Sequence, residues 1–221
     1  MLFRSVRNGD GAALMQNVPL AARIVEAVAK AVSVPVTVKC RLGWDRGNLC
    51  VVELAQAVAG AGAQAIAVHG RTRAMLYSGV ADWDTIRQVK QAVAIPVIAN
   101  GDIFSGEAAV QCQKRSAADF LMLGRGVFGD PWLFQEVNAA LEGRPIPPRP
   151  PLAARMDTAL EQLHLARQDK GEHIACLEAR KHFAWYLRGV AYSGYYKERI
   201  SHIATMAEAE AIAAGIKWDL K

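Results

Sequence analysis

The sequence has 221 residues, of which 52% are hydrophobic and 21% are charged. This composition excludes a disordered chain and indicates a folded globular protein with one large domain, or with a medium and a smaller one. The formal net charge of +5 favours acidic partners only weakly. Because the apolar stretches are too short to cross a bilayer and no secretory signal pattern is present, we expect a cytoplasmic protein without a membrane partner.

Helical and strand patterns alternate along the first part of the chain with a period of about 30 residues, the size of a repeated αβ unit. Short runs rich in Val, Ile, Leu and Ala predict four strands that are buried on both faces and therefore parallel. The predicted strands cover residues 34–41, 65–70, 95–100 and 120–124, and the helices that precede them cover residues 19–32, 49–60, 83–93 and 105–114.

Each predicted strand ends in a polar loop that contains glycine, as the strands of a (β/α)8 barrel do. A closed barrel needs eight strands and about 250 residues, whereas this sequence supplies four strands. Two interpretations follow: the four strands form an open sheet, or they are what remains of a barrel that has lost its four preceding units.

A proline-rich segment, residues 143–151, follows the last barrel-like helix and predicts a stiff, extended linker. Beyond it the sequence has helical periodicity near residues 152–169, 173–191 and 205–214, with no strand pattern. We therefore expect three parts: a barrel-like domain over residues 1–142, the linker, and a small helical domain over residues 152–221.

Two basic side chains lie on one face of the first predicted strand, because alternation places Lys39 and Arg41 opposite Cys40. A solvated pair of surface charges is the simplest explanation, but a strand this apolar would bury them, and buried cations need an anionic partner. The second strand repeats the pattern with His69 and Arg71. The two strands together favour a shared pocket for a ligand.

Glycine-containing turns end the last two strands, at Asn100-Gly101-Asp102 and at Gly124-Arg125-Gly126. Glycine follows many strands, so each turn alone is weak evidence for a phosphate site. Together, at the position where barrels commonly bind phosphate, they predict a phosphorylated cofactor.

The helical part contains the segment 180–188, which mixes basic and aromatic residues and begins with Arg180 and Lys181. An amphipathic helix with a solvated cationic face explains this segment as well as a nucleic-acid surface does. The four cysteines are far apart in sequence, without a CxxC pair or metal-ligand spacing, and we expect four free thiols and no metal site; they are Cys40, Cys50, Cys112 and Cys176.

Five ordered motifs resemble the tRNA-dihydrouridine synthase family. They are Pro35-Val-Thr-Val-Lys-Cys-Arg-Leu-Gly43, Val68-His-Gly-Arg-Thr-Arg73, Pro96-Val-Ile-Ala-Asn-Gly-Asp102, Leu121-Met-Leu-Gly-Arg-Gly126 and Arg180-Lys-His182. The resemblance covers nearly the whole chain from about Gly9. It implies an α/β fold that is the C-terminal half of a TIM (β/α)8 barrel, with four parallel strands, followed by a small all-α domain that binds tRNA.

The resemblance also implies a reaction, in which FMN is reduced by NADPH and then reduces uridine to 5,6-dihydrouridine in tRNA. Residues of this chain would take part as cofactor ligands, namely Lys39, His69, Asn100, Gly101, Asp102, Gly124 and Arg125. Four basic residues would lie on the side of the substrate and RNA: Arg41, Arg71, Arg180 and Lys181.

The general acid of the family is a cysteine in a Gly-Cys-Pro setting, and this sequence contains no such tripeptide. Cys40 points away from the expected site, and Cys50, Cys112 and Cys176 fall in helical patterns. We therefore expect no catalytic residue in this chain, and a truncated form that lacks the N-terminal half of its barrel and is inactive alone. Two alternatives remain: a non-catalytic RNA-binding remnant, and an FMN-barrel oxidoreductase that acts on a small metabolite.

Overall fold

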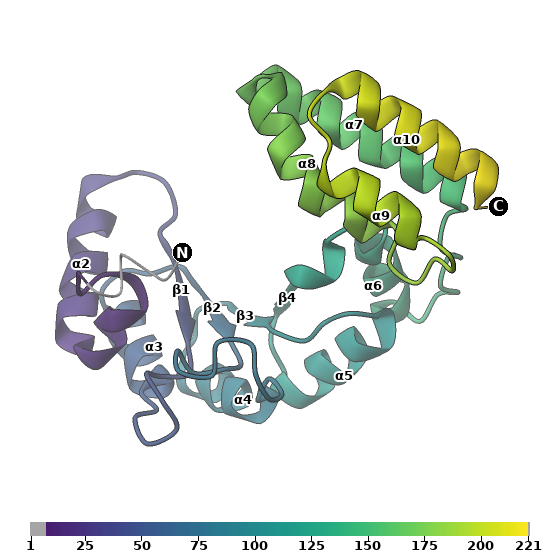
Figure 1. The fold of residues 1–221 in the computed structure, drawn as a ribbon. Coiled ribbons are helices and arrows are strands. Elements are labelled where there is room, and N and C mark those ends of the chain that lie inside the picture. The colour runs from purple at the N-terminus through teal and green to yellow at the C-terminus, as the bar shows by residue number, and fades with distance from the viewer. Residues whose placement is uncertain (1–7, 221) are drawn as a thin grey trace. The chain divides into compact units, whose positions relative to one another are not determined.

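The structure, a computed structural model, describes residues 8–220 (Figure 1). These residues form two compact units. The sheet unit comprises the described residues up to Gly126 together with Val137–Arg144, and the helical unit comprises Val127–Glu136 together with the residues from Pro145 onward. Residues 127–136 thus group with the helical unit, whereas the sequence placed them in the first domain.

Four parallel strands form the sheet in the order β1-β2-β3-β4, which confirms the predicted parallel pairing. β1 and β3 begin later than predicted, because Pro35 and Pro96 lack the N–H group that a strand needs for its ladder. The strands are β1 (Thr37–Arg41), β2 (Ala65–His69), β3 (Val97–Asn100) and β4 (Phe120–Met122).

Helices α3, α4 and α5 pack along one face of this sheet, and α2 packs beside α3 (Figure 1). Three helices start at side chains that accept backbone hydrogen bonds: Asn17 at α2, Asp82 at α4 and Ser105 at α5. The elements are η1 (Gly11–Gln16), α2 (Val18–Ala31), α3 (Val51–Gly60), α4 (Trp83–Ala92) and α5 (Gly106–Ser116). The ends of the four α-helices differ from the predicted ones by two residues at most, and η1 was not predicted.

The other face of the sheet is more open. Thr37 and Lys39 of β1 are exposed on it, and so is Phe120 of β4, at 61% exposure. On α2, the apolar side chains of Ile24, Val28 and the following Val32 are also exposed, at 42–44%. The face that carries Lys39 is therefore accessible to a ligand or to another polypeptide segment.

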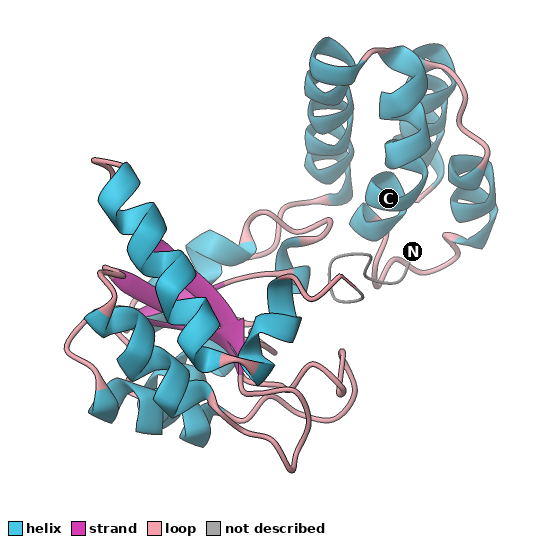
Figure 2. Ribbon diagram, turned by 90° about the vertical axis from the view of Figure 1, so that its left-hand side faces the viewer, coloured by secondary structure: helices cyan, strands magenta, loops and turns pink. Residues whose placement is uncertain are grey.

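The described part of the helical unit contains helices and no strand (Figure 2). Its elements are α7 (Leu152–Lys170), α8 (Glu172–Tyr186), α9 (Gly194–Ser201) and α10 (Met206–Asp219), while η2 (Arg125–Val127) and α6 (Leu133–Leu141) each have residues in both units. Their buried side chains form one core that includes Met156, Phe183, Ile200 and Ile216. α8 ends at Tyr186, before the predicted residue 191, and α9 has no counterpart in the prediction.

Phe128 and Gly129 connect the segment 127–136 to α8. The Phe128 ring stacks on Trp185, with 4.2 Å between ring centroids and an angle of 9° between the planes. Gly129 has a φ of +70° and lies so close to the backbone of Trp185 that an added Cβ would come within 2.3 Å of its carbonyl carbon. Only glycine satisfies both conditions.

Across the described residues, each helix is too short or too polar to span a membrane.

We predict that Gly129→Ala destabilises the helical unit far more than Gly189→Ala. Gly189 shares the positive φ, at +76°, but has no atom within 4 Å of an added Cβ. Gly189→Ala should lower the free energy of unfolding by roughly 1 to 2 kcal/mol for the backbone alone, and Gly129→Ala by roughly 2 to 5 kcal/mol because overpacking adds to it. Urea denaturation followed by circular dichroism measures both. Equal losses of unfolding free energy in the two variants would show that the close approach of residue 129 to Trp185 does not affect stability.

Candidate functional site

The carboxyl ends of the strands bring polar side chains from three strands into one row. In the parallel register Arg41 lies beside His69, and His69 lies beside Asn100. Lys39 lies beside Ala67 in the row below. Because side chains in register share a face of the sheet, Lys39, Arg41, His69 and Asn100 lie on the open face. Alternation along the first two strands predicted this for Lys39, Arg41 and His69.

Lys39 and His69 both have lowered pKa values. Lys39 is exposed at the surface of the sheet, but the surrounding chain partly desolvates its ammonium group, which is the first cause of its lowered pKa, and the nearby Arg41 cation lowers the pKa further. The His69 side chain is buried, and its pKa falls to about 4, first through burial and then through the cations Arg41, Lys39 and Arg71. Asp102 opposes this shift only in part. His69 is therefore neutral at pH 7, with one ring nitrogen that donates and one that accepts.

The turn at Asn100-Gly101-Asp102 is held from both sides. Asn100 Nδ2 donates to Met122 O at 2.8 Å, and the Trp83 indole donates to Gly101 O at 3.0 Å. Gly101 has a φ of +119°, and an added Cβ would come within 2.9 Å of His69 Cδ2. Gly101 is therefore required for packing, and any ligand contact there comes from its backbone.

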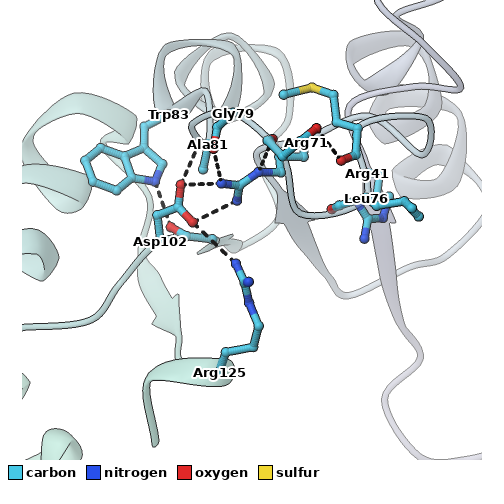
Figure 3. Close-up of polar contacts among 11 residues, drawn as sticks. Arg41, Arg71, Leu76, Gly79, Ala81, Trp83, Asp102 and Arg125 are labelled. Carbon is cyan, nitrogen blue, oxygen red and sulfur yellow. Dashed lines mark hydrogen bonds and ion pairs between the residues drawn. The ribbon is translucent and has the colours of Figure 1, made fainter. Parts of the chain in front are cut away.

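Asp102 is the centre of the polar contacts at this edge (Figure 3). Its carboxylate accepts two hydrogen bonds from Arg71, at 2.8 and 2.7 Å, and one from Ala81 N at 2.8 Å. Arg125 Nη2 lies 3.6 Å from the same carboxylate. Burial alone would raise the pKa of Asp102, but the hydrogen bonds from Arg71 and Ala81 and the two guanidinium charges hold it below its usual value.

The two arginines expected on the substrate side, Arg41 and Arg71, bind loop carbonyls. Arg41 Nη1 donates to Thr72 O and to Leu76 O, both at 3.0 Å. Arg71 is 2% exposed, and beyond Asp102 it donates to Ser78 O and Gly79 O. Alternation predicted that Arg71 shares a face with His69, but β2 ends at His69 and the chain turns there, with Arg71 N donating to His69 O at 2.7 Å.

The second predicted phosphate turn, at Gly124 and Arg125, is open. A Cβ added to Gly124 would meet only Asn100 Nδ2, at 4.0 Å. Arg125 lies over the Tyr77 ring, with 4.2 Å from Cζ to the ring centroid. Tyr77 is 57% exposed, and its ring centroid is 6.4 Å from that of His69. Tyr77 could not be predicted as a site residue, because residues 71–82 form a loop without strand or helix periodicity.

The predicted RNA-side residues of the helical unit, Arg180 and Lys181, differ in exposure. Arg180 is partly buried, and its Nε donates to Ile203 O at 2.9 Å. Lys181 is exposed, with Nζ 5.2 Å from the centre of the Trp185 ring. An exposed set of basic and aromatic side chains continues along α9 and the loop before it: Arg188, Tyr192, Tyr195, Lys197 and Arg199.

The four cysteines are free thiols, as predicted. Burial raises the pKa of Cys40 and of Cys112 to about 12, and Cys176 is buried as well. The Cys50 thiol donates to Met15 O at 3.1 Å. Three of the four thiols are thus buried, and the fourth, on the partly exposed Cys50, is hydrogen bonded to a backbone carbonyl. Within residues 8–220, no group of three or more His, Cys, Asp or Glu side chains could hold a metal ion.

The sequence matches the family described as Dihydrouridine synthase (Dus) over residues 4–218. The chain belongs to the dihydrouridine synthase family.

Relatives within this family carry corresponding names. The chain is 44% identical over 187 residues to a probable tRNA-dihydrouridine synthase of Rickettsia prowazekii (strain Madrid E), which covers 85% of this chain and 57% of that protein. It is 38% identical over 202 residues to tRNA-dihydrouridine synthase B of Pasteurella multocida (strain Pm70), which covers 91% and 61%. A third relative, tRNA-dihydrouridine synthase B of Pseudomonas aeruginosa, is 46% identical over 180 residues, which covers 80% and 53%. The chain thus spans between about half and three fifths of each relative.

We predict that His69 titrates with a midpoint near pH 4. The unfolded chain binds this proton below a pKa of about 6.5, whereas the folded chain binds it only near pH 4. The free energy of unfolding should therefore decrease as the pH falls from about 6.5 towards 4. NMR of the His69 ring gives the midpoint, and His69→Gln should reduce the loss of stability in that window. A midpoint near 6.5 would contradict the burial of this ring among cations.

Proposed function

We propose that this chain provides the flavin site and an RNA-binding surface of a tRNA-dihydrouridine synthase, which reduces uridine in tRNA with FMN and NADPH. One observation carries the proposal: the strand ends gather the cations Lys39, Arg41 and Arg71 near His69, and the single carboxylate beside them, Asp102, is contacted by Arg71 and Arg125. This excess of positive charge, next to an open glycine turn, favours a phosphorylated ligand.

The open turn fits the phosphate of FMN. The space above Gly124 lets a phosphate approach the main chain, and Arg125 offers a planar guanidinium beside it. Asn100 and the backbone of Gly101 and Asp102 lie at the neighbouring strand end. In this proposal, Gly124 and Arg125 bind the phosphate and the Asn100 turn forms the adjoining wall.

Lys39 and His69 fit the part of the site that meets the flavin ring. The bound flavin supplies the hydride chemistry, and the residues of this chain bind and orient it. Lys39 supplies a cation that stabilises negative charge on the ring. His69, kept neutral by burial and by three nearby cations, can donate one hydrogen bond and accept another without adding charge.

The four-stranded sheet corresponds in this proposal to four consecutive units of a TIM barrel, and the open face of the sheet to the barrel interior. Lys39 on that face and the polar residues at the strand carboxyl ends support the assignment, because TIM-barrel sites lie at those ends. The helical unit provides the RNA surface, through the exposed cations and aromatic rings on α9 and in the loop before it.

None of the four cysteines serves as the general acid in this proposal, because three are buried and the Cys50 thiol is hydrogen bonded to a carbonyl. A non-catalytic RNA-binding protein would have the same surface on the helical unit without binding FMN. An FMN enzyme that acts on a small metabolite would need no RNA surface. The two experiments below separate these alternatives.

We predict that Lys39→Ala and Arg125→Ala differ in their effect on FMN binding. Arg125→Ala should weaken binding by roughly 1.5 to 3 kcal/mol, the value of a charge-assisted hydrogen bond. Lys39→Ala should leave FMN at least partly bound and slow the reduction of the flavin by NADPH. Titration of FMN into each purified variant, followed by stopped-flow absorbance, measures both properties. If excess FMN restores the rate of Lys39→Ala but not that of Arg125→Ala, the two roles are reversed.

We predict that the purified chain binds unmodified tRNA but forms no dihydrouridine on it, even with FMN and NADPH present. The physical reason is that three thiols of this chain are buried and the fourth, on Cys50, already donates its proton to Met15 O, so none is assigned as the acid that protonates the base. Filter binding measures the affinity, and mass spectrometry of digested tRNA measures dihydrouridine. Dihydrouridine above the level of an enzyme-free control would show that another group acts as the acid, and absence of tRNA binding would favour the small-metabolite alternative.

A further inference from the structure

Arg71, Asp102 and Arg125 form a chain of contacts in which only the last member is open to a ligand. We propose that Arg71 and Asp102 are positioning residues, whose side chains hold the Arg125 guanidinium at the Gly124 turn and contact neither RNA nor cofactor. This inference rests on the proposed FMN site. It assigns the Arg71 side chain a different role from the substrate contact that the sequence predicted, and the Asp102 side chain a different role from the predicted cofactor contact.

The donors of Arg71 are already used within the chain. A guanidinium has five N–H groups, and Arg71 makes four hydrogen bonds: from Nε to Ser78 O at 3.0 Å, from Nη1 to Asp102 Oδ1 at 2.8 Å, and from Nη2 to Gly79 O at 2.6 Å and Asp102 Oδ2 at 2.7 Å. The side chain is 2% exposed. A phosphate of RNA could reach it only if the loop over residues 72–80 moved away.

The carboxylate of Asp102 is equally committed. One oxygen accepts from Arg71 and from Ala81 N, and the other accepts from Arg71 and lies 3.6 Å from Arg125. A carboxylate beside a phosphate site would repel the ligand, but the bidentate pair with Arg71 neutralises it. Arg125 then contributes a full positive charge to the site, and Asp102 fixes where that charge lies.

Tyr77 holds Arg125 from a second direction. Its ring lies 4.2 Å from the guanidinium carbon, and it belongs to the loop whose carbonyls at Leu76 and Ser78 accept from Arg41 and Arg71. Arg71 thus acts on Arg125 by two routes, through the Asp102 carboxylate (Figure 3) and through the loop that carries Tyr77. An arginine held in this way loses less freedom when it binds a phosphate.

A double-mutant cycle tests whether Arg71 acts through Arg125. Arg71→Lys keeps the charge but cannot make the bidentate contact, and it should raise the Kd for FMN about tenfold. In an Arg125→Ala background the same change should raise the Kd less than about twofold, because the group that Arg71 positions is gone. Arg87→Lys is the matched control. Arg87 lies on α4, away from the strand ends, and like Arg71 it donates to two backbone carbonyls of the sheet unit, those of Lys114 and Arg115. It should leave the Kd unchanged.

The salt dependence of tRNA binding provides a readout that a purely positioning residue does not change. Arg71→Met should leave the slope of log K against log salt unchanged, whereas Lys181→Ala should reduce it by about one, as expected for a lost phosphate contact. A reduced slope for Arg71→Met, or additive effects on the FMN Kd in the cycle, would overturn the inference.

A surface variant keeps the test decisive if changes at the buried Arg71 unfold the chain. Tyr77→Leu removes the ring over Arg125 at an exposed position, so the fold should tolerate it. It should raise the Kd for FMN several-fold in the wild-type background and not in the Arg125→Ala background, and equal effects in both would overturn the inference. If the wild-type chain binds no FMN at all, the proposed function fails. If the chain binds FMN but the effects of the Arg71 and Arg125 substitutions on the Kd are additive, only the positioning role is contradicted.

Discussion

The bidentate ion pair between Arg71 and Asp102 joins two turns that parallel strands would otherwise leave independent. β2 and β3 each end in a turn, and Arg71 follows the first while Asp102 belongs to the second. With Arg71 almost fully buried, removal of either partner would leave an uncompensated charge, which typically costs about 3 to 5 kcal/mol. The loop over residues 72–80, the indole of Trp83 and the guanidinium of Arg125 all take their positions from this pair or from the turns that it connects.

The charge balance at the strand ends follows from the same pair. Asp102 offsets one arginine, so the remaining cations act on whatever lies on the open face of the sheet. His69 responds to this field by remaining neutral, since burial and three nearby cations both disfavour its protonated form. The site thus combines a positive potential, suited to a phosphate, with a neutral imidazole, suited to a ring that exchanges hydrogen bonds.

Strand periodicity predicted much of this arrangement, because it depends on local pattern. The four parallel strands are confirmed, and alternation correctly placed Lys39 on the face opposite the buried Cys40. The predicted burial of the strands on both faces was wrong, because Thr37, Lys39 and Phe120 are exposed on the open face. The prediction also failed where the chain leaves regular structure. Arg71 comes after the turn that ends β2, so alternation no longer determines its direction, and Tyr77 lies in a loop that has no period. α9 was missed because it is only eight residues long and follows a glycine-containing loop, so its sequence has little helical periodicity. The packing of Tyr196 and Ile200 in the core of the helical unit stabilises it.

The backbone at Asp102 has a φ of +58°, a conformation that side chains other than glycine rarely adopt. Asparagine and glycine tolerate this geometry but carry no charge, and glutamate carries the charge but enters the left-handed region at a cost of about 1 to 2 kcal/mol. Only aspartate combines a short carboxylate with tolerance of this backbone. The geometry of the turn therefore favours aspartate over glutamate at position 102, although the two side chains carry the same charge.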